Sequence, residues 1–470
     1  MNNTDQIFTD MNENFRYLHM GLPEDILRRK LSGDFKGALR LIDQRLADPK
    51  IPQAMKHSLT AQREIICRLP ADYPFTREEA LARVREHIPD FTEAEFDERV
   101  DAGKIGWICS EGGVRYFIRF FETLCKTEPA FGVRAGVTLP GAESAGKSAG
   151  KETYQEYCIR RMKEEGSCSC RIRVRSTMRI KDEVFVPGMK VRAHLPIPAE
   201  CPEQTDIVLE EISPAGGQAA PGDAPQRTVF WEKTLMENET FTVQYSYIRK
   251  AVYHDTDRLT PDPVQPDFFT QEEAPHIVFT PYIRELTEKL TEGVDSPLEK
   301  ARRFYDFITK NMTYTFMPSY FVLDNIAENC ARNFTGDCGV FALLFLTLCR
   351  CAGIPARWQS GMATEPAFCG CHDWAQFYIA PYGWLYADPS YGLAAVRAGK
   401  EERRQFYFGN LEPCRMAANH AFQAPFTEGK KFWRADPYDN QVGEIELENR
   451  GLRYDEYERD KQVLLCEDLK

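Results

Sequence analysis

The chain has 470 residues, of which 43% are hydrophobic and 28% charged, and its net charge at pH 7 is −12. This composition is typical of a globular protein of roughly two to four domains, and the negative charge argues against a protein that coats nucleic acid. The amino terminus lacks the basic start and apolar core of a secretory signal, and the apolar run from Val340 to Cys349 is too short to span a membrane. We therefore expect a cytoplasmic protein with no membrane partner.

The fifteen cysteines are odd in number and irregularly spaced, which in a chain without an export signal predicts reduced and mostly buried thiols. Three C-x-C pairs raise the question of a metal site, namely Cys168/Cys170, Cys349/Cys351 and Cys369/Cys371. Structural zinc sites usually have the wider C-x(2–4)-C spacing, and the second pair lies in an apolar helical stretch. From the sequence we predict neither a metal nor a cofactor.

Residues 1–130 are predicted to form a helical domain with a β-hairpin. Capping-box patterns at Thr76 and Thr92 start two helices, and residues 104–118, KIGWICSEGGVRYFI, are typical of a hairpin. Two helices and a hairpin have the outline of a winged helix, a frequent nucleic-acid binder. The second helix, TEAEFDERVDA, is strongly acidic and would repel phosphate, so we expect a structural or protein-binding role and no nucleic-acid partner.

The next two regions are a linker and a β-rich domain. Residues 131–155 contain LPGAESAGKSAGK, which lacks apolar periodicity and predicts a linker. Residues 156–270 contain alternating runs, RIRVR at 171–175 and FTVQYSY at 241–247, which predict strands. The three arginines of the first run are predicted to lie on a solvated outer face of a sheet.

Residues 271–470 are predicted to form the catalytic domain, which contains a capped helix and then a buried one. Ser296 and Pro297 start the first helix. The second follows in residues 335–357, TGDCGVFALLFLTLCRCAGIPAR, whose apolar residues cover every face and whose Gly353 is placed to end it. Cys338 then lies in the first helical turn, where unpaired amides and the helix dipole favour a thiolate. A helical cysteine is more often a small core residue, so its role depends on the residues that follow.

A histidine and an aspartate follow in a predicted hairpin. His372 opens the run HDWAQFYIAPYGWLYADPSYG, which alternates as two strands around a turn at Pro381. His372 begins the first strand and Asp388 ends the second, so both side chains are expected at one rim. A thiolate nucleophile needs such a base, and the base needs an orienting group. His420 is a weaker rival for the base, because nothing places a carboxylate opposite it.

The stretches GDCGVFALLFLTLCRCAGIPAR, HDWAQFYI and GWLYADPSYG resemble the three sequence blocks of the transglutaminase-like superfamily, of the bacterial type. The resemblance covers about residues 280–395 and implies an α+β fold in which a nucleophile helix packs on an antiparallel sheet. It implies Cys338 as nucleophile, His372 as general base and then acid, and Asp388 as the orienting carboxylate. The β-rich region also resembles the β-domain that often precedes this core.

The resemblance implies acyl transfer on amide bonds through a thioester, most simply hydrolysis of a peptide or protein. Two alternatives stay open: transfer to an amine, as in crosslinking, and a non-catalytic scaffold that retains the fold. The Cys338 amide is a natural oxyanion donor. For the second donor we rank Tyr314 ahead of Tyr320 and Asn333, because it ends the capped helical segment.

Two further side-chain questions concern the neighbours of the predicted triad. Asp337 would raise the thiol pKa if it lay close, but its position before the helix predicts a capping role. Cys369 and Cys371 flank His372, where a second thiol could act in redox regulation, although ordinary loop residues are the simpler interpretation.

Overall fold

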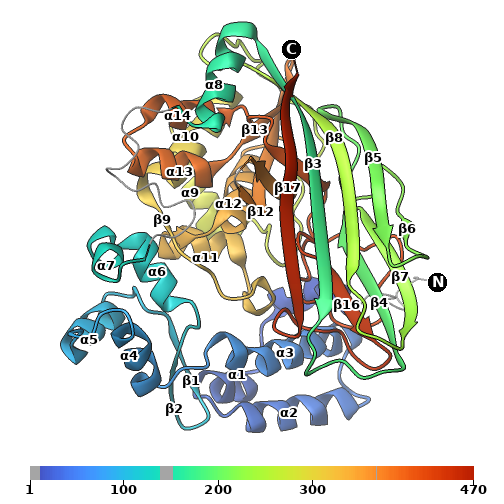
Figure 1. Cartoon of the computed structure of the whole chain (residues 1–470). Helices are drawn as coiled ribbons and strands as arrows, with labels where there is room; N and C mark the ends of the chain where they lie inside the picture. The colour runs from blue at the N-terminus through green and yellow to red at the C-terminus, as the bar shows by residue number, and fades with distance from the viewer. Residues whose placement is uncertain (1–10, 138–151, 367, 470) are drawn as a thin grey trace.

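The computed structural model describes residues 11–137, 152–366 and 368–469, arranged as an N-terminal helical region, a pair of β-sheets and a mixed core (Figure 1). In this view the N-terminal helices lie below the core and the long strands lie beside it. In the described part of the chain, no helix has the length and apolarity needed to cross a membrane.

The N-terminal region begins with helices and ends with the predicted hairpin and two more helices. Its elements are η1 (Met11–Met20), α1 (Glu24–Leu31), α2 (Phe35–Ala47), α3 (Gln53–Asp72), α4 (Arg77–Arg85), α5 (Glu93–Asp101), β1 (Trp107–Ser110), β2 (Gly113–Tyr116), α6 (Phe120–Thr127) and α7 (Pro129–Arg134). Both predicted capping boxes are present, at Thr76 with Glu79 and at Thr92 with Glu95. The predicted linker falls mainly on residues 138–151, which lie outside the described residues, and α8 (Tyr154–Glu165) follows it.

The β-rich region consists of two four-stranded sheets, ordered β17-β3-β8-β5 and β16-β4-β7-β6. Their strands are β3 (Ser167–Ile180), β4 (Met189–Pro196), β5 (Gln204–Ser213), β6 (Gln218–Ala219), β7 (Thr228–Leu235), β8 (Phe241–Val252), β16 (Glu444–Leu447) and β17 (Tyr457–Leu469). In β3 the predicted alternation is present, since Ile172 and Val174 are buried while Arg171 and Arg175 are exposed.

The last two strands return from the C-terminal segment to the β-rich region. β16 pairs antiparallel with β4, and β17 pairs antiparallel with β3 along almost its whole length. Residues 271–470, predicted as one catalytic domain, therefore also complete both neighbouring sheets. Alternation in a sequence shows which side chains share a face, but not which strand lies alongside.

The mixed core has the predicted architecture, a buried helix packed on an antiparallel sheet. Its helices and short elements are α9 (Pro281–Thr291), α10 (Pro297–Asn311), β9 (Thr313–Tyr314), η2 (Tyr320–Val322), α11 (Ile326–Asn333), β10 (Thr335–Gly336), α12 (Cys338–Cys351), α13 (Pro389–Arg397) and α14 (Glu401–Phe406). The sheet has the order β14-β13-β12-β11-β15 and comprises β11 (Ala356–Glu365), β12 (Phe368–Ile379), β13 (Gly383–Ala387), β14 (Phe408–Gly409) and β15 (Arg415–Asn419).

Helix α12 is buried from Gly339 to Arg350 because its apolar residues surround the helix axis. Phe345 packs edge-on against Phe377 of β12, with ring centroids 5.5 Å apart. Burying each such large apolar side chain stabilises the fold by about 1.5–3 kcal/mol. The helix therefore provides a rigid base for the residue at its amino end.

Candidate active site

Cys338 is the first residue of α12, as the sequence predicts. The Asp337 side chain caps the helix by accepting a hydrogen bond from the Val340 amide at 3.2 Å, and Gly353 follows the helix with a φ of +76°. The thiol is half-buried, and the unpaired amides of the first turn surround its position. This placement favours negative charge at Cys338.

Carboxylates next to the thiol act against the effect of the helix dipole. Cys338 Sγ donates a hydrogen bond to Asp373 Oδ2 at 3.2 Å. Burial raises the pKa of the Cys338 thiol well above its ordinary value, and the charges of Asp373 and Asp337 raise it further. These effects favour a neutral Cys338 thiol that donates its proton to a carboxyl group.

His372 and Asp388 form a buried pair. His372 Nε2 lies 2.7 Å from Asp388 Oδ2. The β12–β13 register places Ala375 opposite Ala387, so Asp388, which follows Ala387, lies at the end of the hairpin where His372 is found. Burial lowers the pKa of His372, although Asp388 opposes this effect. The neutral ring then carries its proton on Nε2, facing the carboxylate, which leaves Nδ1 as the basic atom.

Asp388 is held as an anion by several donors. Arg415 Nη2 lies 3.1 Å from Asp388 Oδ2, and the Ser390 hydroxyl and Tyr391 amide each donate to Oδ1 at 3.0 Å. Burial alone would raise the pKa of Asp388, but His372 and Arg415 hold that pKa below its ordinary value. Asp388 is also the N-cap of α13, so the start of this helix fixes the orientation of its side chain.

His372 is thus hydrogen-bonded to Asp388, while the Cys338 thiol donates a hydrogen bond to Asp373, the neighbour of His372 on β12. Successive side chains of a strand point to opposite faces. His372 packs near Tyr391, with ring centroids 4.7 Å apart, whereas Asp373 faces the start of α12. A thiol–imidazole hydrogen bond is not among the contacts of the described residues, so the role of His372 as base stays a prediction. The strand also begins at Phe368, earlier than predicted.

Two of the three candidate oxyanion donors, Tyr314 and Tyr320, lie near Cys338 or its capping residue. Tyr314 in β9 pairs with Gly336 of β10, and its hydroxyl lies within hydrogen-bonding reach of the Cys338 thiol. Tyr320 donates instead to Asp337 Oδ1. Asn333 is exposed and bonds to Asn329, away from the thiol.

Gly339 is required by the close approach of two side chains to the helix start. A Cβ at this position would lie 2.4 Å from the Tyr320 hydroxyl and 2.8 Å from Asp373 Oδ2. These distances are shorter than van der Waals contact, so any larger residue would displace Tyr320 or Asp373. The glycine after the cysteine therefore permits the carboxyl group to reach the thiol.

The N-terminal region contributes a cation that sequence reasoning missed. Lys126 of α6 places its Nζ 3.6 Å from the centroid of the Tyr314 ring. Burial lowers the pKa of Lys126 to about 8, while the nearby Cys338 and Asp337 favour its charged form. No local sequence signal links α6 to α12, because only the tertiary fold brings them together.

A second carboxyl group accompanies Asp373. Asp439 and Asp373 are buried hydrogen-bonded neighbours, and Gln441 donates to Asp373 Oδ1. Burial raises the pKa of Asp373 well above its ordinary value, and the charges of Asp439 and Asp337 raise it further. Two carboxyl groups this close share a proton, as like charges in one buried site cannot both ionise.

The remaining candidates have other partners. His420 Nδ1 lies 3.0 Å from Gln359 Nε2, and burial lowers the pKa of this histidine to about 4. Cys371 is exposed and accepts a hydrogen bond from Lys461 Nζ at 2.8 Å, while Cys369 contacts the sulfur of Met362. All three lie outside the contacts made by Cys338.

Comparison with known proteins finds a family match over the segment that contains this site. Residues 284–389, which contain Cys338, His372 and Asp388, match the transglutaminase-like superfamily. This segment is a transglutaminase-like core. The identification confirms the predicted resemblance and agrees with the buried helix and antiparallel sheet described above.

Two curated relatives have no assigned function. An uncharacterized protein of Bacillus subtilis, YebA, is 26% identical over 130 residues, which are 24% of this chain and 18% of that protein. An uncharacterized protein of Haemophilus influenzae is 26% identical over 188 residues, which are 31% of this chain and 48% of that protein. The chain thus matches less than half the length of either relative.

Comparison with solved structures matches part of the chain to a Cytophaga hutchinsonii protein described as a cysteine protease. It is 18% identical, has a TM-score of 0.43, and the match covers 65% of this chain and 91% of that one. The periplasmic domain of TgpA from Pseudomonas aeruginosa, bound to ethylmercury, is 16% identical with a TM-score of 0.27, covering 48% and 92% respectively.

Proposed function

We propose that the protein is a transglutaminase-like cysteine hydrolase that cleaves amide bonds in peptides or proteins through a thioester on Cys338. The observation that carries this proposal is the buried His372–Asp388 pair at 2.7 Å, on the strand that also supplies the hydrogen-bond partner of Cys338. A histidine oriented by an anionic carboxylate is the kind of base that activates a cysteine nucleophile.

The reaction begins with transfer of the Cys338 proton to His372 Nδ1. The thiol's hydrogen bond to Asp373 has to be exchanged for one to the imidazole, which belongs to the adjacent residue of β12. Asp388 keeps the imidazole in the required tautomer and stabilises the imidazolium that forms. Substrate binding beside Cys338 would supply the energy for this exchange.

The thiolate then attacks the amide carbonyl and forms an oxyanion. The Cys338 backbone amide and the Tyr314 hydroxyl are the proposed donors, each worth about 3 kcal/mol of transition-state stabilisation. The imidazolium returns its proton to the leaving amine, which leaves a thioester on Cys338. Water, deprotonated by His372, hydrolyses the thioester and restores the thiol.

The test is a substrate-profile assay with quenched peptides and fluorescent casein. Cys338→Ala should abolish turnover and prevent a mass-detectable acyl-enzyme, whereas Cys351→Ala, at the opposite end of the same helix, should retain activity. A bound substrate should protect Cys338 from alkylation by iodoacetamide at neutral pH, because the amide covers the thiol and then acylates it. Unchanged activity in Cys338→Ala would contradict the proposal, and the absence of turnover in both the wild type and the variant would favour a scaffold.

The same assay distinguishes hydrolysis from amine transfer, since both pass through one acyl-enzyme. New amino termini in the product indicate hydrolysis, and incorporation of a labelled primary amine indicates crosslinking. We also propose a reducing compartment, the cytoplasm, because all fifteen cysteines are free thiols. Fractionation of cells that express the protein tests this localisation.

A further inference from the structure

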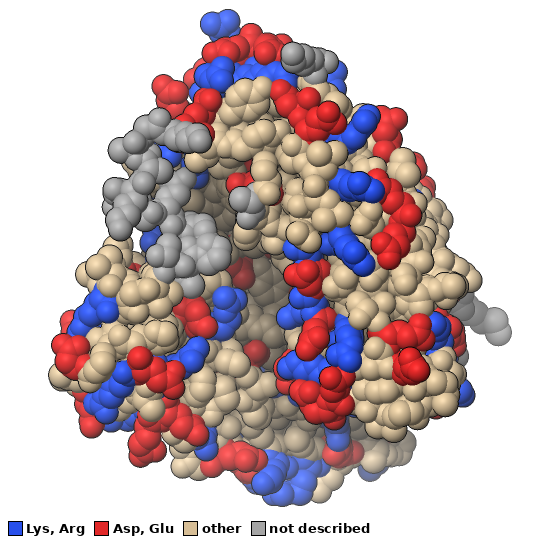
Figure 2. All heavy atoms as spheres, in the orientation of Figure 1, with Lys and Arg blue, Asp and Glu red and all other residues tan. Residues whose placement is uncertain are grey.

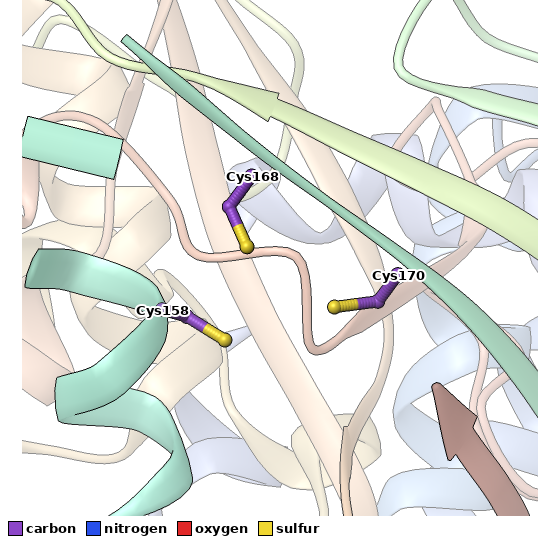
Figure 3. A group of neighbouring side chains, drawn as sticks. All are labelled: Cys158, Cys168 and Cys170. Carbon is purple, nitrogen blue, oxygen red and sulfur yellow. The ribbon is translucent and has the colours of Figure 1, made fainter. Parts of the chain in front are cut away.

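Five of the fifteen cysteines converge at one place, away from the candidate active-site thiol. The sulfur atoms of Cys158, Cys168 and Cys170 all lie within 4.8 Å of one another, and all three residues are buried. Figure 3 shows the three sulfur atoms turned toward a common space between α8 and β3. The C-x-C pair of β3 reaches this space because residues two apart in a strand share a face.

Two more thiols extend the group on its other side. Cys414, also buried, lies within hydrogen-bonding reach of Cys158 and Cys466, and Cys466 lies within reach of Cys170. Cys158, Cys170, Cys466 and Cys414 therefore form a closed ring of four sulfur neighbours. Cys168 caps one edge of this ring.

We propose that these cysteines form a closed structural site for one thiophilic d10 cation, with Zn²⁺ as the expected occupant and Cu⁺ as the chemical alternative. Four sulfur ligands at about 2.3 Å from Zn²⁺ stand about 3.8 Å apart in a tetrahedron. Small side-chain rotations would bring Cys158, Cys168 and Cys170, whose sulfur atoms lie within 4.8 Å of one another, to this spacing. Soft thiolates select such metals over Mg²⁺ or Ca²⁺. The burial of four of the five cysteines fits a structural site without an open coordination position.

A hydroxyl group and a guanidinium next to the cysteines would stabilise metal-bound thiolates. The Tyr154 hydroxyl lies 3.2 Å from Cys170 Sγ, where it can donate to a metal-bound sulfur. The Arg161 guanidinium interacts electrostatically with Cys168 and pairs with Asp468. Zn²⁺ would displace one proton from each ligating thiol, and Arg161 would offset part of the resulting negative charge.

The sequence argument against zinc assumed that ligands come from one local motif. Here the five cysteines come from α8, β3, the segment before β15, and β17. A bound ion would therefore fasten the C-terminal strand and the core sheet to α8. Cys414 also precedes Arg415, the residue that bonds Asp388, so the site lies beside the support of the candidate catalytic pair.

Metal analysis of the full-length protein, purified in reductant without chelator, tests the proposal directly. We expect about one zinc per chain, and reconstitution of the stripped protein with Co²⁺ under anaerobic conditions should saturate at about one equivalent with sulfur-to-cobalt charge-transfer absorption. Copper in place of zinc, bound at the same stoichiometry, would assign the site to Cu⁺.

Variants locate the ion. Cys158→Ser with Cys170→Ser should lose the metal and the cobalt spectrum, while Cys67→Ser, outside the cluster, should keep both. If the double variant fails to fold, the cobalt titration of the wild-type protein still decides whether an ion binds. A folded wild-type protein that binds neither metal, or a mass spectrum showing native disulfides among these cysteines, would overturn the proposal. None of these measurements depends on amide hydrolysis.

Discussion

Cys338 Sγ lies 3.2 Å from Asp373 Oδ2, so the thiol of the proposed nucleophile donates a hydrogen bond to a carboxyl group of the adjacent sheet. This contact holds the proton on sulfur and distinguishes the site from a thiolate–imidazolium pair. It leads to predictions about the reactivity of the thiol that do not require a known substrate.

Asp373→Asn should make Cys338 more reactive. The substitution removes a carboxyl group that raises the pKa of the Cys338 thiol, so that pKa should fall. At neutral pH alkylation should speed up by about tenfold for each pKa unit. The measurement is the pH profile of iodoacetamide labelling at Cys338, followed by peptide mass spectrometry. Asp101→Asn, on the exposed surface of the N-terminal region, is the control and should leave the profile unchanged. An identical profile for Asp373→Asn would show that this carboxyl group does not control the thiol.

Lys126→Met should have the opposite effect. The charged ammonium favours a thiolate at Cys338, and because burial lowers the lysine pKa to about 8, this support is present at neutral pH and lost above that value. Labelling of Lys126→Met at neutral pH should therefore be several-fold slower than wild type, and the difference should vanish above about pH 9. Lys126→Arg, which keeps its charge across the range, should restore fast labelling at neutral pH. Equal rates for all three proteins at neutral pH would contradict a role for this cation.

Arg415→Met should weaken both stability and the proposed catalytic pair. Arg415 is fully buried between Asp388 and Glu412, so its loss leaves two buried carboxylates without their cation. The expected loss in free energy of unfolding is about 3–5 kcal/mol, measured by urea denaturation. Arg83→Met, whose ion pair with Glu86 is exposed, should cost less than about 1 kcal/mol. A loss of similar size in both variants would contradict the role of Arg415 as the cation that neutralises these two buried carboxylates.

Asp72→Asn should flatten the pH dependence of stability. Burial raises the pKa of Asp72 from 3.8 to about 6, so the native state holds a proton that the unfolded state releases. Its stabilising contribution is present below the unfolded pKa and is lost as the pH rises through about 6. The variant should therefore match wild type near about pH 4 and exceed it by about 2 kcal/mol near about pH 7.5. Urea unfolding at both pH values measures the difference, and an equal offset at the two values would contradict it.

Local patterns predicted the elements that carry the site. The capping residues Thr76, Thr92 and Ser296 occupy their expected positions, since a cap depends on residues within one helical turn. The hairpin that joins His372 to Asp388 was predictable because its turn and alternation are local. The face of β12 that meets α12 was not predictable, because alternation defines two faces without saying which one is covered.

Figure 2 shows why composition alone is a poor guide to partners here. Acidic and basic side chains are interspersed over the visible face, and the surface is hollowed between the N-terminal helices and the long strands. A net charge is a sum over the whole chain and carries no information about such a hollow. Its shape depends on how the helical region packs against the core.

The sequence by itself determined a buried helix with a cysteine at its start, a hairpin bearing His372 and Asp388, and the transglutaminase-like family of that segment. Only the tertiary structure decided that Asp373 meets the thiol, that Lys126 approaches it from another region, and that five cysteines converge. The physical reason is range: caps, turns and periodicity act between near neighbours, whereas these three relationships join segments brought together only by packing of the core.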